Sequence, residues 1–319
     1  MGFASAVRRM LPLLLAIIPL FAYSFDSERW LEKRSVMTAD AARLRAEYSN
    51  SVKRVSSPSE GIAIPLETYP DGRIRTLVSA TKAQFFADNS LVWAEDLRFV
   101  KMNADGSEEL RLDASSCLID RVSRSGWVEG HAKVVQDKTL FEGDNVYFSS
   151  SNSFVTAYMS SDLKSSDLKY GGLRPDERSD TNKTSAVSAR IRAKRTDMDR
   201  SEGVIMFEDD VFVEYSSDYT LNSARLFAFL KGTNSISRIV ASGGVTVTNE
   251  SRVGECDMAV FREHERRIDM YGGAGRPARL LETSGTRSEV VGSKVSFWID
   301  TEQVEVVAPI ISVEEKNVR

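Results

Sequence analysis

Short β-rich runs make up most of this 319-residue chain. From Ile62 onward, runs rich in β-branched and aromatic residues alternate with turns of glycine, aspartate and asparagine. Within many runs apolar and polar residues alternate with a period of two, as in a strand with one buried face. The turn Asn103-Ala104-Asp105-Gly106 predicts a hairpin between two such runs. No long helical period interrupts the succession, so the fold is predicted to be all-β.

The N-terminus has the pattern of an export segment. Arg8 and Arg9 precede an apolar run from Met10 to Tyr23, and Ala22-Tyr23-Ser24 has small residues at the spacing that signal peptidase prefers. The run is shorter than the roughly 20 residues that a bilayer span needs. Residues 1–24 are therefore expected to be a signal peptide cleaved after Ser24, with an uncleaved membrane anchor as the alternative. No cysteine lies near this site, so a lipoprotein is excluded.

The rest of the chain divides by composition. Helix-favouring residues prevail from Phe25 to Val55, and they predict a charged, loosely packed helical tether over residues 25–60. Its apolar face is thin and consists of Trp30, Leu31, Ala41 and Leu44. The polar stretch from Gly171 to Lys183 indicates a linker. The predicted segments are a β domain at 61–170, a linker at 171–187, a second β domain at 188–307 and a tail at 308–319.

A two-strand unit recurs along the chain. One arm is an acidic or glycine turn followed by Val-x-Val, at Asp210–Val213 and Gly244–Val247. One unit cannot bury its apolar face alone, so neighbouring units must stack. The repeat predicts an elongated, twisted β-jelly roll of antiparallel strand pairs in two consecutive domains. Companion arms are Leu221–Phe227, Gly254–Phe261 and Val291–Phe297, and the N-terminal half repeats the two arms at Gly126–Gly130 and Phe141–Phe148.

Charge and cysteine usage exclude several classes of protein. The net charge of −4 provides no basic field for nucleic acid and argues against a generic binder of anionic membranes. Cys117 and Cys256 lie far apart and are expected to be small buried hydrophobes. His131 and His264 are isolated, so no metal site and no cofactor are expected.

The remaining polar clusters do not predict an enzyme. Consecutive strand residues point to opposite faces, so at most Glu208 and Asp210 of the Glu208-Asp209-Asp210 cluster share one. A turn or bulge is therefore expected there rather than the paired carboxylates of a glycosidase. The chain contains neither a G-x-S-x-G elbow nor a G-x-x-x-x-G-K-[ST] phosphate loop. The one basic run is expected to be a solvated strand face, or alternatively a contact for lipid phosphates: Arg190, Arg192, Lys194 and Arg195.

Three stretches, Glu202–Val213, Leu221–Phe227 and Arg238–Val247, resemble the OstA-type repeat of LptA and of the periplasmic part of LptD. The resemblance extends over about Ala189 to Val307. The stretch Pro65–Lys169 resembles the related LptC domain. LptA and LptC are usually separate chains, so the role of LptA, of LptC or of a fusion of the two stays open.

The resemblance implies a periplasmic carrier of lipopolysaccharide to the outer membrane, which the N-terminal segment would tether to the inner membrane if it is not cleaved. The implied partners are the lipopolysaccharide, the inner-membrane ABC transporter and outer-membrane LptD, which are reached by edge-strand docking, and further copies bound head to tail. The candidate edges are Val290–Val307 and Val187–Ala193.

An apolar groove between two sheets would hold the acyl chains. The alternatives are a filled sandwich core and a structural β-solenoid or adhesin that binds no lipid. The candidate groove residues are alternate inward positions of the strands: Ile191, Ile205, Phe207, Val211, Val213, Leu226, Ala228, Val245, Val247, Ala259, Phe261, Val295, Phe297 and Ile299.

Overall fold

The computed structural model describes residues 27–86, 90–136, 139–165, 189–215, 219–231, 235–273, 275–284 and 288–309. These residues form one long helix, one short 3-10 helix and seventeen strands. The helices are α2 (Ser27–Val52) and η1 (Glu263–Glu265). The strands are β1 (Ser59–Thr68), β2 (Ile74–Phe85), β3 (Leu91–Met102), β4 (Glu108–Asp120), β5 (Ser125–Gln136), β6 (Thr139–Ser149), β7 (Phe154–Ser165), β8 (Ala189–Ala193), β9 (Arg195–Asp199), β10 (Val204–Tyr215), β11 (Tyr219–Lys231), β12 (Ser235–Thr248), β13 (Arg252–Arg262), β14 (Arg267–Tyr271), β15 (Ala278–Glu282), β16 (Glu289–Trp298) and β17 (Val304–Pro309).

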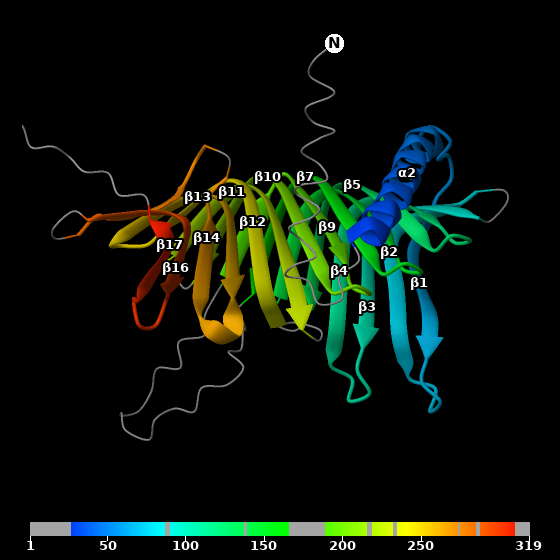
Figure 1. Cartoon of the computed structure of the whole chain (residues 1–319). Coiled ribbons are helices and arrows are strands. Elements are labelled where there is room, and N and C mark those ends of the chain that lie inside the picture. Colours follow the sequence, from blue (N-terminus) through cyan, green and yellow to red (C-terminus); the bar gives the residue numbers. More distant parts are fainter. Residues whose placement is uncertain are drawn as a thin grey trace, which may run out of the picture.

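The strands pair in the order in which they occur along the chain. From β1 to β7 and from β10 to β13, each strand pairs antiparallel with the next one. Both β8 and β9 lie between β7 and β10, and both β14 and β15 lie between β13 and β16, which also pairs with β17. The result is one elongated sheet (Figure 1). The predicted all-β, elongated jelly-roll class is thereby confirmed.

Most strands bend near their middle. The pairing register shifts between Glu208 and Val211 in β10 and between Ser242 and Val245 in β12. The residues at these bends adopt left-handed backbone conformations, with φ of 62° at Asp209 and 86° at Gly243. Such a φ suits glycine and is tolerated by aspartate, which explains the residues found there. The predicted bulge at the acidic cluster is confirmed.

The bends fold the sheet into two facing layers. One layer, the helix-side half-sheet, contains β9, β14 and the halves of the long strands that pair with them. The other layer, the far half-sheet, contains β8, β15 and the halves of the long strands that pair with those. Ile205 and Phe207 before the bend of β10 pack in the same apolar cluster as Val211 and Val213 after it. The interior is therefore built from the alternate inward positions of both layers.

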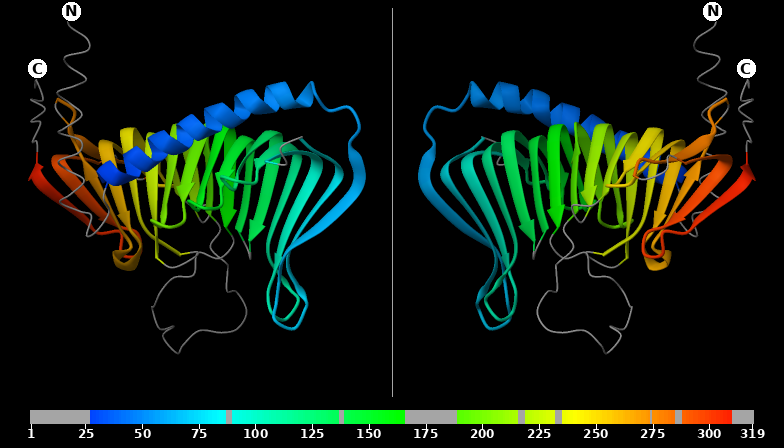
Figure 2. Two further views of the ribbon diagram at one scale, coloured as in Figure 1. Left: turned by 90° about the vertical axis from the view of Figure 1, so that its right-hand side faces the viewer. Right: turned by 90° about the vertical axis from the view of Figure 1, so that its left-hand side faces the viewer.

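Helix α2 covers the outer face of the helix-side half-sheet. It runs obliquely across the strands (Figure 2). Its buried Met37, Ala41 and Leu44 pack on aromatic and apolar residues of that face, namely Phe86, Trp93, Leu118, Trp127, Tyr147 and Phe154. Trp30 is 2% exposed and packs on Val204 and Met206 of β10. The expectation of loose packing is wrong, because bulky sheet residues supply the apolar surface that the helix lacks.

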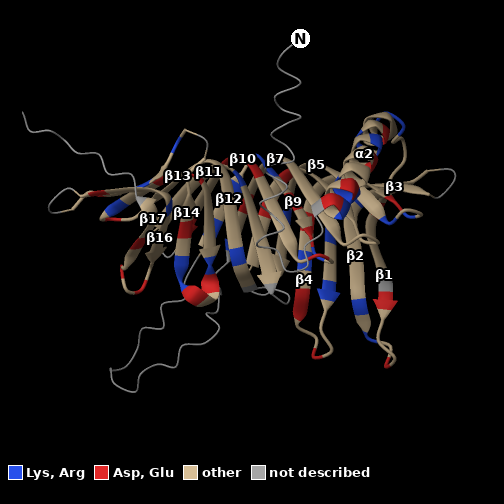
Figure 3. Cartoon of the chain, viewed as in Figure 1, with Lys and Arg blue, Asp and Glu red and all other residues tan. Residues whose placement is uncertain are grey.

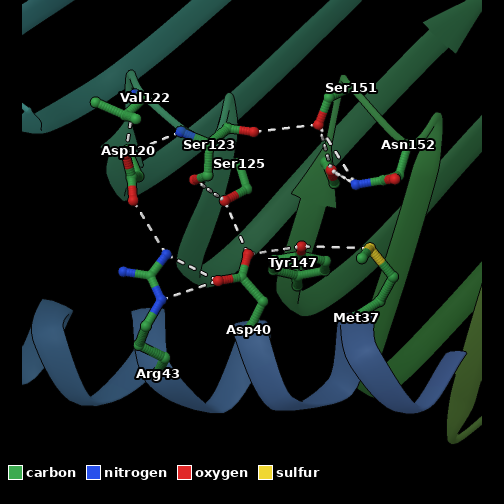
Figure 4. A network of polar contacts seen from close by, with 11 residues as sticks. Met37, Asp40, Arg43, Asp120, Val122, Ser123, Ser125, Tyr147, Ser151 and Asn152 are labelled. Atoms are coloured by element: carbon green, nitrogen blue, oxygen red, sulfur yellow. Dashed lines mark hydrogen bonds and ion pairs between the residues drawn. The ribbon is translucent and has the colours of Figure 1, made fainter. Parts of the chain in front are cut away.

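Polar contacts anchor the middle of α2 to the turns beneath it (Figure 4). Asp40 accepts hydrogen bonds from the hydroxyls of Ser125 and Tyr147, both at 2.9 Å. Arg43 pairs with Asp40 at 2.8 Å and with Asp120 at 3.0 Å. Burial, together with the neighbouring Asp40 carboxylate, raises the pKa of Tyr147, so its hydroxyl stays a donor. The helix is thus fixed in position as well as packed.

Ion pairs hold the first turns of α2 to β9. Asp197 is fully buried and accepts hydrogen bonds from Arg34 at 2.7 Å and from Thr156 at 2.8 Å. Arg34 also contacts Glu208 of β10. Lys33 pairs with the fully buried Asp199 at 2.8 Å. Because a buried carboxylate needs a partner, these contacts commit the helix to one position on the sheet.

The sheet is continuous across the expected linker. Residues 171–187 lie outside the described residues, as do 1–24 and 310–319, so the predicted boundaries there stay predictions. The strands on the two sides of the linker, β7 and β8–β9, pair directly. The expectation that Val187–Ala193 forms an edge is therefore wrong, because β8 has a partner on each side. The edges of the described sheet are β1 and β17. The other expected edge, Val290–Val307, is correct only in its last residues, which belong to β17, because β16 has partners on both sides.

Two further sequence expectations can be compared with the structure. Cys117 and Cys256 are free and buried, as expected, and burial raises the pKa of each thiol to about 12. The prediction that Gly126–Gly130 corresponds to the Val-x-Val arm is wrong. Gly126–Val128 comes before the bend at Gly130, whereas the Val-x-Val arms of β10 and β12 come after the bends of their strands. Within the described part of the chain, no helix is long and apolar enough to span a membrane.

Candidate functional site

An apolar slit lies between the half-sheets where β8 and β10–β14 face one another. It comprises about 840 Å³ of space between atoms, a figure that includes open solvent. The cavity itself measures about 80 Å³, below the roughly 300–1,000 Å³ of ligand pockets, so the slit is narrow. Its lining residues are Ala189, Ile191, Val213, Tyr215, Tyr219, Thr220, Leu221, Leu226, Ile236, Ile239, Val247, Phe261, Glu263, Ile268 and Ile299.

Strand alternation explains why the slit is apolar. In the far half-sheet, Ile191, Val213 and Val247 point inward from β8, β10 and β12. In the helix-side half-sheet, Ile239 on β12 pairs with Phe261 on β13, which pairs with Ile268 on β14. The only carboxylate in the lining is that of Glu263 in η1. The slit therefore offers hydrophobic contact to a slender occupant and few hydrogen bonds.

A second apolar space continues the slit toward β17. Its cavity measures about 20 Å³, and it shares Tyr219, Val247 and Ile268 with the slit. Beyond these residues it is lined by Met270, Leu280 and Phe297, with Arg252 among its few charged neighbours. The two spaces together form a groove that follows the long axis of the sheet from β8 toward the C-terminal edge.

Two polar straps cross the mouth of the groove, where the strand ends of the two half-sheets meet. Arg266, which follows η1 in the helix-side half-sheet, donates a hydrogen bond at 3.0 Å to the hydroxyl of Tyr215 at the end of β10 in the far half-sheet. The rings of Tyr215 and Phe261 lie 6.0 Å apart across the same mouth. Arg252 at the start of β13 pairs with Glu302 in the β16–β17 turn at 3.4 Å. These contacts hold the groove nearly closed.

The predicted groove residues all lie inside the folded sheet, but only some of them line open space. Those that line the slit are Ile191, Val213, Leu226, Val247, Phe261 and Ile299, and Phe297 lines the second space. The others pack in the closed core: Ile205, Phe207, Val211, Ala228, Val245, Ala259 and Val295. Their part in ligand binding stays a prediction.

Sequence reasoning missed several lining residues. Tyr215 ends β10, Tyr219 begins β11, and Ile268 lies on the short strand β14, for which the sequence analysis assigned no inward residues. An alternation count on that run identifies Ile268 and Met270 as inward. The tyrosines carried a weaker signal, because residues beside a turn are usually exposed.

The charged clusters serve structural roles in the described residues. Glu208 pairs with Arg34 and Arg225, whereas Asp210 pairs with Lys194 at 2.5 Å at the bend. Arg190 pairs with Asp162 at 2.6 Å on the outer face of the far half-sheet. Among the described residues, no group of three or more His, Cys, Asp or Glu side chains is placed to hold a metal ion.

Comparison with known proteins gives similarity to solved structures but no match by sequence. No protein-family model matches the sequence, and no curated protein matches it. Among solved structures, the chain is similar to the crystal structure of LptH, the LptA homologous periplasmic component of the lipopolysaccharide transport device of Pseudomonas aeruginosa. The similarity covers 38% of this chain and 82% of LptH, at 13% sequence identity and a TM-score of 0.33.

Proposed function

We propose that this chain is a non-enzymatic periplasmic carrier that shields the acyl chains of lipopolysaccharide in the groove between its two half-sheets. The observation that carries the proposal is the slit itself, which is narrow, apolar along its length and continued toward one edge of the sheet. The sequence resemblance to the OstA-type repeat supports lipopolysaccharide as the lipid.

The energetics of an apolar groove suffice for a carrier without catalysis. Removing a methylene group from water contributes about 0.8 kcal/mol, so a chain of about a dozen carbons gains on the order of 10 kcal/mol. The narrow slit suits such a slender, flexible chain better than a bulky rigid ligand. Because the lining has few hydrogen-bonding groups, it favours the acyl part of an amphiphile and leaves the polar part at the mouth.

Photo-crosslinking in the cell tests the proposal. A photo-reactive residue replaces Val247 or Phe261, which line the slit, and Thr246 provides the matched control. Thr246 precedes Val247 on β12 and points to the opposite face of the sheet. We expect lipopolysaccharide adducts at Val247 and Phe261 and none at Thr246. A folded, exported protein with no lipid adduct at either slit position would instead indicate a closed structural sandwich.

The open edges complete the proposal. The outer side of β17 has no strand partner among the described residues, and neither has the outer side of β1. Strand addition at such edges would join this chain to the transporter side, to the outer-membrane side or to another copy head to tail. Cysteines placed on β1 and β17 are expected to form disulfide-linked oligomers if copies join head to tail, and only monomers if they do not.

A further inference from the structure

The inward residues of the two half-sheets align in cross-strand rows. Residues directly opposite each other on neighbouring strands share a face of the sheet, so a row can be followed through the pairing register. In the far half-sheet one row passes from Phe141 on β6 through Leu163, Ile191 and Val213 to Leu221 on β11. This order places Phe141 and Leu163 directly beyond the residues of the row that line the slit.

The helix-side half-sheet has a matching row. It passes from Val155 on β7 through Met198, Ile205 and Ala228 to Ile239 on β12. Every member of the two stretches is apolar, so the inner faces remain apolar on both sides of β8 and β9. The residue types alone therefore give no reason for the slit to stop at β8.

The open space nevertheless ends at β8. Ala189 and Ile191 line the slit, whereas Leu163, the next residue of the far row, is not among its described lining residues. Leu163 is 7% exposed and Phe141 is 5% exposed, and both pack in the same cluster as Ile191 and Ile205. The slit thus ends against a leucine and a phenylalanine side chain.

The two half-sheets approach each other closely beside this pair. Gly143 follows Phe141 on the same face of β6, and a Cβ atom placed on it would lie 2.8 Å from the Cβ atom of Ala157 in the helix-side half-sheet. Real Cβ atoms essentially never come so close, so no further side chain fits there. The same added atom would lie 3.5 Å from Cζ of Phe141. The phenylalanine ring therefore fills the space that the close approach leaves.

The geometry of the groove indicates how an acyl chain lies in it. The cavity of the slit, about 80 Å³, is larger than that of the second space, about 20 Å³, so the chain points toward β8. Acidic residues mark η1 beside the mouth (Figure 3), and the polar end of an amphiphile stays at this polar border. From β13 to β8 the path crosses four inter-strand spacings of about 4.8 Å, roughly 19 Å in total, or an extended chain of about fifteen carbons.

We propose that Phe141 and Leu163 form an apolar plug that sets the greatest length of acyl chain the slit can hold. The inference rests on the proposed carrier function and adds a specificity to it. A chain that ends at the plug is buried along its whole length, whereas a longer chain leaves its additional methylene groups in water. The groove therefore gains no affinity from methylene groups beyond the limiting length.

A series of chain lengths measures the limit. The purified full chain is titrated with unbranched saturated fatty acids of increasing length, each of which competes with a fluorescent fatty acid. Each buried methylene group contributes about fourfold in affinity, so the dissociation constant should fall by about this factor per carbon until the chain reaches the plug. Beyond that length the dissociation constant should stay the same.

Two variants shorten the plug. F141L and L163A remove the same number of carbon atoms from the end of the slit, so each should allow at least one further methylene group to be buried. The first fatty acid beyond the limit of the parent chain should then bind about fourfold more tightly to either variant. F154L is the matched control, because Phe154 on β7 is 1% exposed and packs on the outer face under α2. This control should keep the limit of the parent chain.

Three results would overturn the plug. An affinity that rises over the whole series would show that the slit has no stop, and an unchanged limit in both F141L and L163A would place the stop elsewhere. An equal extension in F154L would point to a general loosening of the fold. L163A keeps the test decisive if F141L does not fold. In all three results the fatty acids still bind and the carrier function stands, whereas absence of binding at every length would refute the carrier function and the plug with it.

Discussion

Replacing Tyr215 by phenylalanine should open the mouth of the groove. The change removes the one hydroxyl that accepts the hydrogen bond from Arg266 at 3.0 Å and leaves the ring contact with Phe261 in place. A hydrogen bond to a charged group contributes about 1.5–3 kcal/mol when buried. Because Arg266 keeps its ion pair with Asp300 and the mouth borders solvent, we expect a loss of roughly 1 kcal/mol, or about a fivefold larger open population.

Stopped-flow mixing with an environment-sensitive fluorescent fatty acid measures the consequence. If the mouth must open before an acyl chain is admitted, Tyr215→Phe should bind the probe about fivefold faster. The second strap should matter less, because Glu302 is 69% exposed and surface ion pairs contribute about 0–1 kcal/mol. Glu302→Gln is therefore expected to change the binding rate by less than about twofold.

Tyr69→Phe is the matched control. Its hydroxyl donates a hydrogen bond at 2.8 Å to the backbone carbonyl of Met102, near the β1–β2 turn and outside the slit lining. The same chemical change there should leave the rate of probe binding unaltered. A rate for Tyr215→Phe equal to that of Tyr69→Phe would refute the idea that the straps control access to the groove.

Three further outcomes follow from burial and charge. Trp30→Ala should lower the free energy of unfolding by about 3–5 kcal/mol and expose α2 to limited proteolysis, whereas Leu31→Ala, at a position 42% exposed, should change it by less than about 0.5 kcal/mol. Burial opposes a low pKa at Asp269, but Ser296, Lys294 and Arg262 outweigh it and hold that pKa below 3.8. The ionised carboxylate therefore stabilises the fold fully above about pH 4, and this stabilisation is lost as the pH falls through the lowered pKa. In urea denaturation at a series of acid pH values, the free energy of unfolding of Asp269→Asn should accordingly fall less with decreasing pH than that of the parent chain. Cys117 and Cys256 should resist a thiol reagent in the native protein at about pH 8 and react in denaturant, because burial raises both thiol pKa values to about 12.

Alternation along the strands predicted which residues face inward, and the bends were marked by their residue types. Ile205 and Phe207, or Val245 and Val247, are inward because a strand repeats every two residues. The same pattern cannot separate groove from core. Val245 is packed in the core and Val247 lines the slit, although they are two residues apart on one face. The difference lies in the separation of the half-sheets, which no single strand encodes.

The packing of helix α2 on the sheet was not predicted, because the sequence features that indicate it lie in two distant segments. Helix α2 shows only a thin apolar stripe, but the run Val204-Ile205-Met206-Phe207 is apolar at every position, which is typical of a strand buried on both faces. Combining the two observations would have placed a helix over β10. The prediction of an edge strand at Val187–Ala193 was wrong for a different reason. The polar residues before this segment indicated a break in the sheet, but β7 and β8 pair directly.

The ion pairs between α2 and β9 have a consequence for the order of assembly. Neighbouring strands meet across short turns, so the sheet can grow by successive local steps as the chain is delivered. The contact between Arg34 and Asp197 instead joins residues 163 positions apart. The helix is therefore the first described element to be synthesised and among the last to find its place. Until β9 arrives, the aromatic face of β3–β7 is without its full cover, and a holding chaperone would find its binding surface there.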